Sequence, residues 1–266
     1  MRGLCNLGNT CYFNTAVQCM AHVPPLTKHL FEANLAANPC EITKEYQKVV
    51  IQLFLKGQTD PVNPRDLLTA FQNRFSAFAN QQQHDAQEVI LLLIDVFEQS
   101  LGKEYIMSLF NGEEINETIY PGGRSESRSS FVTRFLDVTA PCKLNEALDK
   151  RSEPTAIMDY KDKTGKTHYV AAIRNRVDRW PKIISVAFSM YNGKFPVEIP
   201  EEFEGRRLFA CVLHSGVRQG GHYALLVRRW DKWYLKDDES VQKMPDINRF
   251  NNTYYMAFYR PKNSLS

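Results

Sequence analysis

A cysteine near the start of the chain and a histidine and an aspartate near its end are the residues that could do covalent chemistry together. Cys11 lies within residues 3–18, where glycines and asparagines lead into an apolar run with helical spacing. His222 follows two glycines, and Asp237 comes one predicted hairpin later. A thiol nucleophile needs a base and a group that orients the base. These types therefore predict thiol-dependent hydrolysis if the fold brings the three side chains together.

The residues around Cys11 predict an activated thiol at the start of a helix. Thr10, or Asn9 before it, suits the N-cap of the helix that the apolar spacing predicts. The positive end of the helix dipole would lower the pKa of the thiol below the roughly 8.5 of a free cysteine. The Asn6 amide and nearby backbone N–H groups could hold an oxyanion. For an isolated cysteine, a small buried residue in a core helix is the ordinary alternative.

His222 and Asp237 are predicted to face each other across a hairpin. His222 begins one expected strand and Asp237 ends the next, so the returning chain brings the carboxylate back to the imidazole. Asp238 comes directly afterwards and could share the role of orienting group. We expect His214 to shape a loop rather than to act as a base. The remaining histidines are assigned ordinary structural roles: His22, His29, His84 and His168.

The composition is that of a globular protein without an obvious cofactor. The 266 residues are 43% hydrophobic and carry a net charge of +3, with Lys and Arg scattered along the chain, which argues against a nucleic-acid partner. Six cysteines without a CxxC pair suit a reducing intracellular compartment, cytoplasmic or nuclear, and offer no zinc-ligand spacing. No apolar run is long enough to cross a membrane. We expect a monomer that needs neither a metal nor another cofactor.

The hydrophobic pattern changes from helical to strand-like near residue 105. Apolar stripes with helical spacing, such as the one in residues 41–56, dominate before that point. Short β-branched and aromatic runs between turn residues follow and predict antiparallel sheet. The Ser/Arg-rich residues 124–130 predict a polar loop within it. We therefore expect one α+β domain that folds as a unit over residues 1–266, with lobes at 1–105 and 106–266.

Three segments together resemble the ubiquitin-specific protease family of deubiquitinating cysteine peptidases. They are the Cys11 stretch, residues 83–88 (Gln-His-Asp-Ala-Gln-Glu) and the strand that begins Gly-Gly-His-Tyr at residue 220. Weaker matches at residues 109–112, 180–181 and 254–259 lie between and after them. Because the segments occur in the family's order, the resemblance covers essentially the whole chain. It implies a papain-like fold in which the active site lies between a helical thumb and an antiparallel β palm.

The resemblance also assigns roles to individual residues. It makes Cys11 the nucleophile, His222 the general base and Asp237 the orienting carboxylate, and Asn6 matches the position that helps to form the oxyanion hole. The positions that match those binding the extended C-terminal tail of ubiquitin are Gln83 and Asp85, with His214, Gly220, Gly221 and Tyr223 at the 214–221 loop that borders the tail channel. That tail carries arginines, which would pair with a carboxylate, and ends in Gly-Gly, which can enter a narrow cleft.

Two departures from the family pattern concern the fingers and the residue before Asp237. Family members often carry two zinc-binding cysteine pairs on β-fingers, but residues 115–125 and 158–170 contain no cysteine. The fingers are therefore expected to be reduced, either short or metal-free. Lys236 occupies a position that is more usually aromatic or amide, and we expect the triad to tolerate it.

The expected activity is hydrolysis of the isopeptide or peptide bond after the C-terminal glycine of ubiquitin. Ubiquitin or a ubiquitin-conjugated protein would then be the partner. Two alternatives stay open from the sequence: a protease for another ubiquitin-like modifier, and a non-catalytic scaffold that binds ubiquitin. A generic papain-like peptidase is a weaker one, because residues 83–88 would then have no role.

Overall fold

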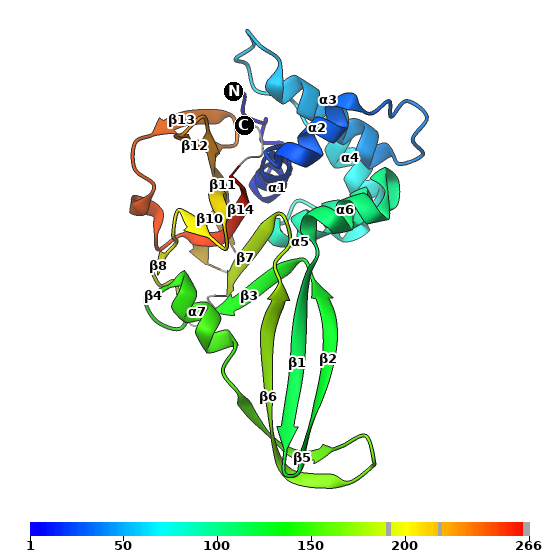
Figure 1. Cartoon of the computed structure of the whole chain (residues 1–266). Coiled ribbons are helices and arrows are strands. Elements are labelled where there is room, and N and C mark those ends of the chain that lie inside the picture. The colour runs from blue at the N-terminus through cyan, green and yellow to red at the C-terminus, as the bar shows by residue number, and fades with distance from the viewer. Residues whose placement is uncertain (190–192, 218–219, 263–266) are drawn as a thin grey trace.

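A computed structural model of the chain describes residues 1–189, 193–217 and 220–262. Figure 1 shows helices gathered at one end, a β-sheet beside them, and a long β extension that points away from both. The α+β architecture expected from the sequence is therefore confirmed. Among the described residues, no helix combines the length and apolarity needed to cross a membrane.

The first 110 residues form the helical lobe, the thumb. Apolar stripes drive this lobe together, and α1 at its centre is buried along its whole length. Its helices are α1 (Cys11–Ala21), α2 (Pro24–Glu32), α3 (Glu41–Phe54), α4 (Arg65–Arg74), the 3₁₀ turn η1 (Ser76–Phe78), α5 (Ala86–Leu101) and α6 (Lys103–Phe110). The predicted change from a helical to a strand-like hydrophobic pattern at residue 105 falls inside α6.

The palm is an eight-stranded sheet that is antiparallel except for one pair. Its strands run in the order β13-β12-β11-β10-β14-β7-β3, with β9 beside β10, and β3 and β7 are parallel. The bounds are β3 (Thr133–Asp137), β7 (Ile184–Ser189), β9 (Glu202–Phe203), β10 (Arg206–Val217), β11 (Gly220–Arg229), β12 (Lys232–Asp237), β13 (Ser240–Met244) and β14 (Tyr254–Pro261). A small parallel pair, β4 (Cys142–Lys143) with β8 (Val197–Glu198), the helix α7 (Leu144–Arg151) and the 3₁₀ turn η2 (Asn248–Phe250) complete this lobe.

The fingers are a four-stranded sheet in the order β2-β1-β6-β5. Its strands are β1 (Gly112–Tyr120), β2 (Gly123–Phe131), β5 (Thr155–Lys161) and β6 (Thr167–Arg179). The expected polar loop at 124–130 is wrong, because these residues pair with β1 from Phe131 back to Gly123. Their side chains are nearly all exposed, so no apolar alternation marks the strand. The fingers are also not short, since β6 runs for 13 residues, and their strands contain no cysteine.

One hydrophobic core joins the thumb to the palm. Buried residues of α1 and α5, such as Phe13 and Phe97, belong to the same cluster as Phe209, Leu225 and Phe258 of the palm strands. A second cluster lies on the other face of the palm and includes Val186 and Leu226. The alternating inward positions of β10, β11 and β14 thus face two cores at once. This packing fixes α1 against β11, which is the contact that matters for the site.

Candidate active site

Cys11 is the first residue of α1 and is 2% exposed. Thr10 occupies the N-cap position, as predicted, but its side chain makes no cap bond to the helix. Instead, the Leu7 N–H donates to Thr10 Oγ1 over 2.9 Å, and Asn6 Oδ1 accepts from the N–H groups of Gly8 (2.9 Å) and Thr10 (3.3 Å). The side chains of this loop therefore fix the backbone that leads into the nucleophile.

The expected lowering of the Cys11 pKa is wrong. Burial raises the pKa of this thiol, and the negative charge of Asp238 raises it further. The backbone N–H of Tyr223 on β11 acts in the opposite direction, as do those of Tyr12 and Cys11 at the N-terminus of α1, but burial outweighs their effect on the pKa. Desolvation outweighs the helix terminus, so the free thiol needs a base to become a nucleophile.

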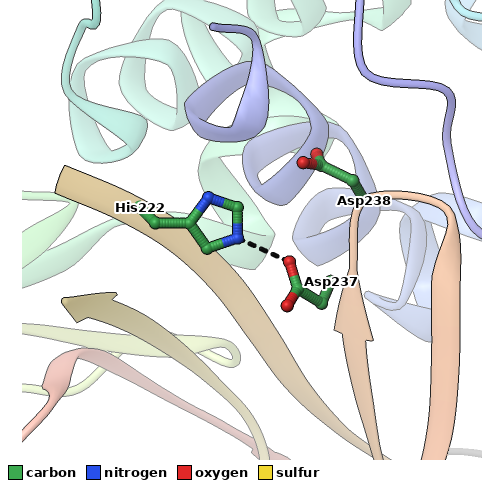
Figure 2. A group of neighbouring side chains, drawn as sticks. All are labelled: His222, Asp237 and Asp238. Carbon is green, nitrogen blue, oxygen red and sulfur yellow. Dashed lines mark hydrogen bonds and ion pairs between the residues drawn. The ribbon is translucent and has the colours of Figure 1, made fainter.

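His222 and Asp237 form the pair that was predicted across the β11–β12 hairpin. His222 Nε2 lies 2.5 Å from Asp237 Oδ1, and both side chains are 44% exposed. Figure 2 shows the imidazole on β11 facing the carboxylate at the end of β12. With the Nε2–H donating to Asp237, Nδ1 is the nitrogen left to take a proton from a nucleophile.

The Cys11 sulfur contacts Tyr223, the residue that follows His222. The Tyr223 backbone N–H bonds to this sulfur and lowers its pKa, which is possible because α1 packs against β11. Within the part of the chain that the structure describes, the hydrogen bonds do not include one between Cys11 and His222. The three predicted side chains are thus gathered from opposite ends of the sequence, with the imidazole already oriented by its carboxylate.

Asp238 does not bond to His222 as Asp237 does; it accepts hydrogen bonds from two asparagines. Its Oδ2 accepts from Asn6 Nδ2 and its Oδ1 from Asn14 Nδ2, each over 2.7 Å. Asp238 follows β12 with a φ of 47°, and its bond to Asn14 shows that its side chain reaches α1. An amide offers two N–H bonds, so Asn6 keeps one for an oxyanion. Figure 2 shows Asp238 set apart from the His222–Asp237 pair.

Asn14 is a site residue that sequence reasoning missed. It is 2% exposed, and it also donates to the Cys5 carbonyl (3.2 Å). The sequence did hold one signal for Asn14. It follows Cys11 by three residues, and residues three apart lie on the same face of a helix. A buried amide on that face requires a partner, and Asp238 supplies it.

Gln83 and Asp85 both lie where the thumb meets the palm. Gln83 Oε1 accepts the Gly221 N–H over 2.5 Å, which ties residue 83 to the strand that carries His222. Asp85 caps α5 by accepting the Gln87 N–H (2.8 Å), and it also accepts the hydroxyl of Tyr255, another residue that the sequence did not single out. The predicted tail-binding positions therefore border the site.

The predicted loop at 214–221 is mostly strand. β10 extends to residue 217 and β11 starts at Gly220, with His214 paired to Tyr223; residues 218 and 219 lie outside the described residues. Glycines and polar side chains obscure the strand pattern here, but the antiparallel register is continuous. The His214 ring stacks on Tyr223 at 4.5 Å, and burial lowers its pKa to about 4. His214 is therefore neutral at neutral pH.

Lys236 is buried between the two halves of the site. The residue is 3% exposed, and its Nζ donates to the Gln18 side chain (2.7 Å) and the Arg2 carbonyl (3.0 Å). It thus joins β12, which carries Asp237, to α1, which carries Cys11. Burial lowers the pKa of Lys236 to about 7.

A metal is not required to explain the acidic atoms at this site. One ligand atom each from His222, Asp237 and Asp238 lie within 4.8 Å of one another. Asp237 already binds the imidazole Nε2, and the two Asp238 oxygens accept from amides. These partners arrange the cluster for proton transfer rather than for coordination.

This fold and this cysteine–histidine–aspartate arrangement are those of a papain-like thiol hydrolase. The sequence model of the ubiquitin carboxyl-terminal hydrolase family matches residues 2–259 of the chain. The chain belongs to that family.

Relatives and solved structures of the family match over nearly the whole chain. Ubiquitin carboxyl-terminal hydrolase 16 of Arabidopsis thaliana is 24% identical over 97% of this chain and 30% of its own length. Ubiquitin carboxyl-terminal hydrolase 17-like protein B of Mus musculus is 23% identical over 99% of this chain and 64% of its own. The chain thus spans about a third to two thirds of these relatives.

The fold is shared with a solved deubiquitinating module. The structure titled SAGA DUB module Ubp8/Sgf11/Sus1/Sgf73 bound to monoubiquitin has a TM-score of 0.82 and 19% identity, over 98% of this chain and 69% of that one. A second structure of the module, bound to ubiquitin aldehyde, has a TM-score of 0.81.

Proposed function

We propose that the protein is a deubiquitinase that hydrolyses the bond after the C-terminal glycine of ubiquitin. The observation that carries this proposal is the His222–Asp237 pair at 2.5 Å, one residue from the backbone N–H that contacts the Cys11 sulfur. Membership of the ubiquitin carboxyl-terminal hydrolase family supplies the substrate class.

The reaction follows from the positions of three side chains. His222 Nδ1 takes the Cys11 proton, and the sulfur attacks the glycine carbonyl. The second Asn6 N–H and the backbone N–H groups ahead of Cys11 stabilise the oxyanion. The protonated His222 then gives its proton to the leaving lysine amine, and the Cys11 thioester remains. Water, deprotonated by His222, hydrolyses this thioester and frees the thiol.

The border of the site suits an extended, side-chain-free peptide end. The Gln83–Gly221 bond brings thumb and palm together beside the nucleophile. A substrate that ends in two glycines can enter between them, and the Asp85 carboxylate offers a partner to an arginine further along its tail. We further propose that the protein acts as a monomer in a reducing compartment, where its six free thiols remain reduced.

Turnover of a fluorogenic ubiquitin substrate tests this proposal. The wild type should release the fluorophore, and Cys11→Ala should abolish release while Cys19→Ala, which changes a buried thiol elsewhere on α1, should not. No turnover by the wild type, with ubiquitin still bound, would identify a non-catalytic scaffold. Faster turnover of a substrate built on another ubiquitin-like modifier would reassign the modifier.

A further inference from the structure

A groove lies on the side of the molecule where the end of α3 meets the β11–β12 turn. Its volume is about 530 Å³, and its walls come from the loop after α3, from the turn at residues 229–230, and from β12 and β13. Arg229 ends the strand on which His222 is the third residue. Arg229 follows His222 by seven residue steps, which span about 23 Å of extended chain, so the groove is separate from the active site.

Arg229 lines this groove and lies over two aromatic rings. Its guanidinium carbon lies 4.3 Å from the centre of the Trp230 ring and 5.4 Å from that of Phe54. Among the hydrogen bonds and ion pairs of the described residues, none involves the Arg229 guanidinium, whereas the neighbouring Arg228 pairs with Glu201 and Asp231. Contact with the two rings holds the guanidinium in place, and its N–H groups can donate to a carboxylate.

Trp230 lies in the two-residue turn that joins β11 to β12. Trp230 has a φ of 45° and Asp231 a φ of 63°, and positive φ at both central residues is what the two-residue turn of a β-hairpin requires. Trp230 is 62% exposed, although its ring is large and apolar. This exposure adds apolar surface to the groove that a partner's side chain can cover.

The charges around the groove have one sign. Lys56, Arg229 and Lys243 line it, and no aspartate or glutamate does among the described residues. Asp231, the nearest acid in the sequence, pairs with Arg207 at 2.6 Å and with Arg228 at 3.5 Å. Apolar surface between these cations comes from residues such as Leu55, which is 51% exposed.

We infer that this groove binds a short peptide segment in which acidic residues flank an aromatic or branched aliphatic side chain. A carboxylate would seat on the fork of Arg229, and Lys56 and Lys243 would attract its neighbours. The apolar side chain would pack on Trp230 and Phe54. Such a segment belongs to a protein partner other than ubiquitin and binds independently of the ubiquitin tail.

Fluorescence anisotropy with a labelled peptide of sequence Gly-Asp-Glu-Phe-Asp-Leu-Gly tests this inference on the whole chain. Binding should saturate, weaken with added salt, and weaken by about tenfold or more when Arg229→Gln removes the bidentate contact. Lys243→Gln and Trp230→Ala should each weaken it several-fold. Lys161→Gln makes the same change of charge on the distant fingers and should leave the affinity unchanged.

Two controls separate specific binding from indiscriminate adhesion and from misfolding of the variants. The matched peptide Gly-Lys-Lys-Phe-Lys-Leu-Gly should not bind, and turnover by the groove variants should stay at the wild-type level, which shows that they are folded. Equal binding of both peptides, or wild-type affinity in all three groove variants, would overturn the inference. Tighter, Arg229-dependent binding of a single-stranded oligonucleotide would also overturn it and assign the groove to a nucleic acid.

Discussion

At the scale of single residues, Asp238 joins the nucleophile's loop to the palm. It accepts hydrogen bonds from Asn6 and Asn14 and raises the pKa of Cys11. These two effects oppose each other in catalysis, because the carboxylate orders the oxyanion donor but disfavours the thiolate.

Asp238→Asn should therefore separate thiol reactivity from turnover. The lost negative charge lowers the pKa of Cys11, so alkylation by iodoacetamide at pH 7 to 8 should become faster. Turnover of ubiquitin should fall, because an asparagine presents one oxygen to two amide donors and one of these loses its acceptor. The measurement is both rates on one preparation, with Cys11→Ala as the control for alkylation elsewhere. A parallel change of the two rates would contradict this account.

Lys236 should make stability depend on pH. Its pKa is about 7 in the folded protein, below its ordinary value of 10.5. The unfolded chain therefore binds more protons between these values, and folding stability rises with pH in that window. Relative to Lys236→Met, the wild type should gain about 1.4 kcal/mol per pH unit from pH 7 to 9. Urea unfolding of both proteins at several pH values measures the difference, and parallel curves would show that burial does not lower the pKa of Lys236.

Residue types and spacing led to Cys11, His222 and Asp237 as candidates, and the structure pairs His222 with Asp237, but the sequence did not report the environment of these residues. The helix terminus suggested a low thiol pKa, whereas the direction is set by burial, which a local sequence pattern does not report. Asn14 and the contacts of Lys236 were missed for the same reason. Asn14 bonds to Asp238 and Lys236 bonds to Arg2, and each pair is separated by more than 200 residues along the chain.

At the scale of elements, the pairing of β10 with β11 positions His222. A Cβ atom on Gly221 would lie 2.2 Å from His214 Nε2 and 2.6 Å from the Ser215 carbonyl oxygen. A Cβ atom on Gly220 would have no atom within 4 Å. The close approach of His214 thus demands glycine at 221, directly before His222.

Gly221→Ala should disturb both stability and the site. The added methyl group must displace the paired strand, which costs about 1 to 3 kcal/mol of unfolding free energy, and the shift should lower turnover by moving His222. Gly220→Ala is the matched control and should stay within about 0.5 kcal/mol of the wild type. Thermal unfolding and turnover of the two variants test this. Equal behaviour of the two variants would show that the hairpin tolerates a shift here.

Elements with an apolar period were predictable and polar elements were not. The helix expected at 41–56 is found as α3 at Glu41–Phe54, because its apolar stripe faces the core. The strand β2 has the composition of a loop, and its backbone pairing with β1 gives no sign in its side chains. Strand pairing is a property of two segments, so one segment read alone cannot reveal it.

At the scale of the whole molecule, the thumb and palm share one core and the fingers stand outside it. None of the finger strands, all of which the structure describes, contributes a residue to either hydrophobic cluster. Figure 1 shows the four strands projecting from the body. Local opening there would expose little apolar surface. The assignment of residues 1–266 to one catalytic domain stays a prediction.

Hydrogen exchange should therefore divide the chain into fast and slow parts. Amides of β2 and β5 should exchange faster than those of β10 and β11 by a factor on the order of a hundred or more. Exchange followed by mass spectrometry resolves these segments, and the unfolding of thumb and palm should appear as a single transition. Equal protection of fingers and palm, or separate transitions for thumb and palm, would be inconsistent with the shared core.

The most direct measurement is the site of attachment of a ubiquitin whose C-terminus carries a propargylamide electrophile. The account predicts one covalent adduct, located on Cys11 by peptide mass spectrometry, absent in Cys11→Ala and strongly slowed in His222→Ala. An adduct on Cys5 or another cysteine, or labelling of the wild type that Cys11→Ala does not diminish, would contradict it.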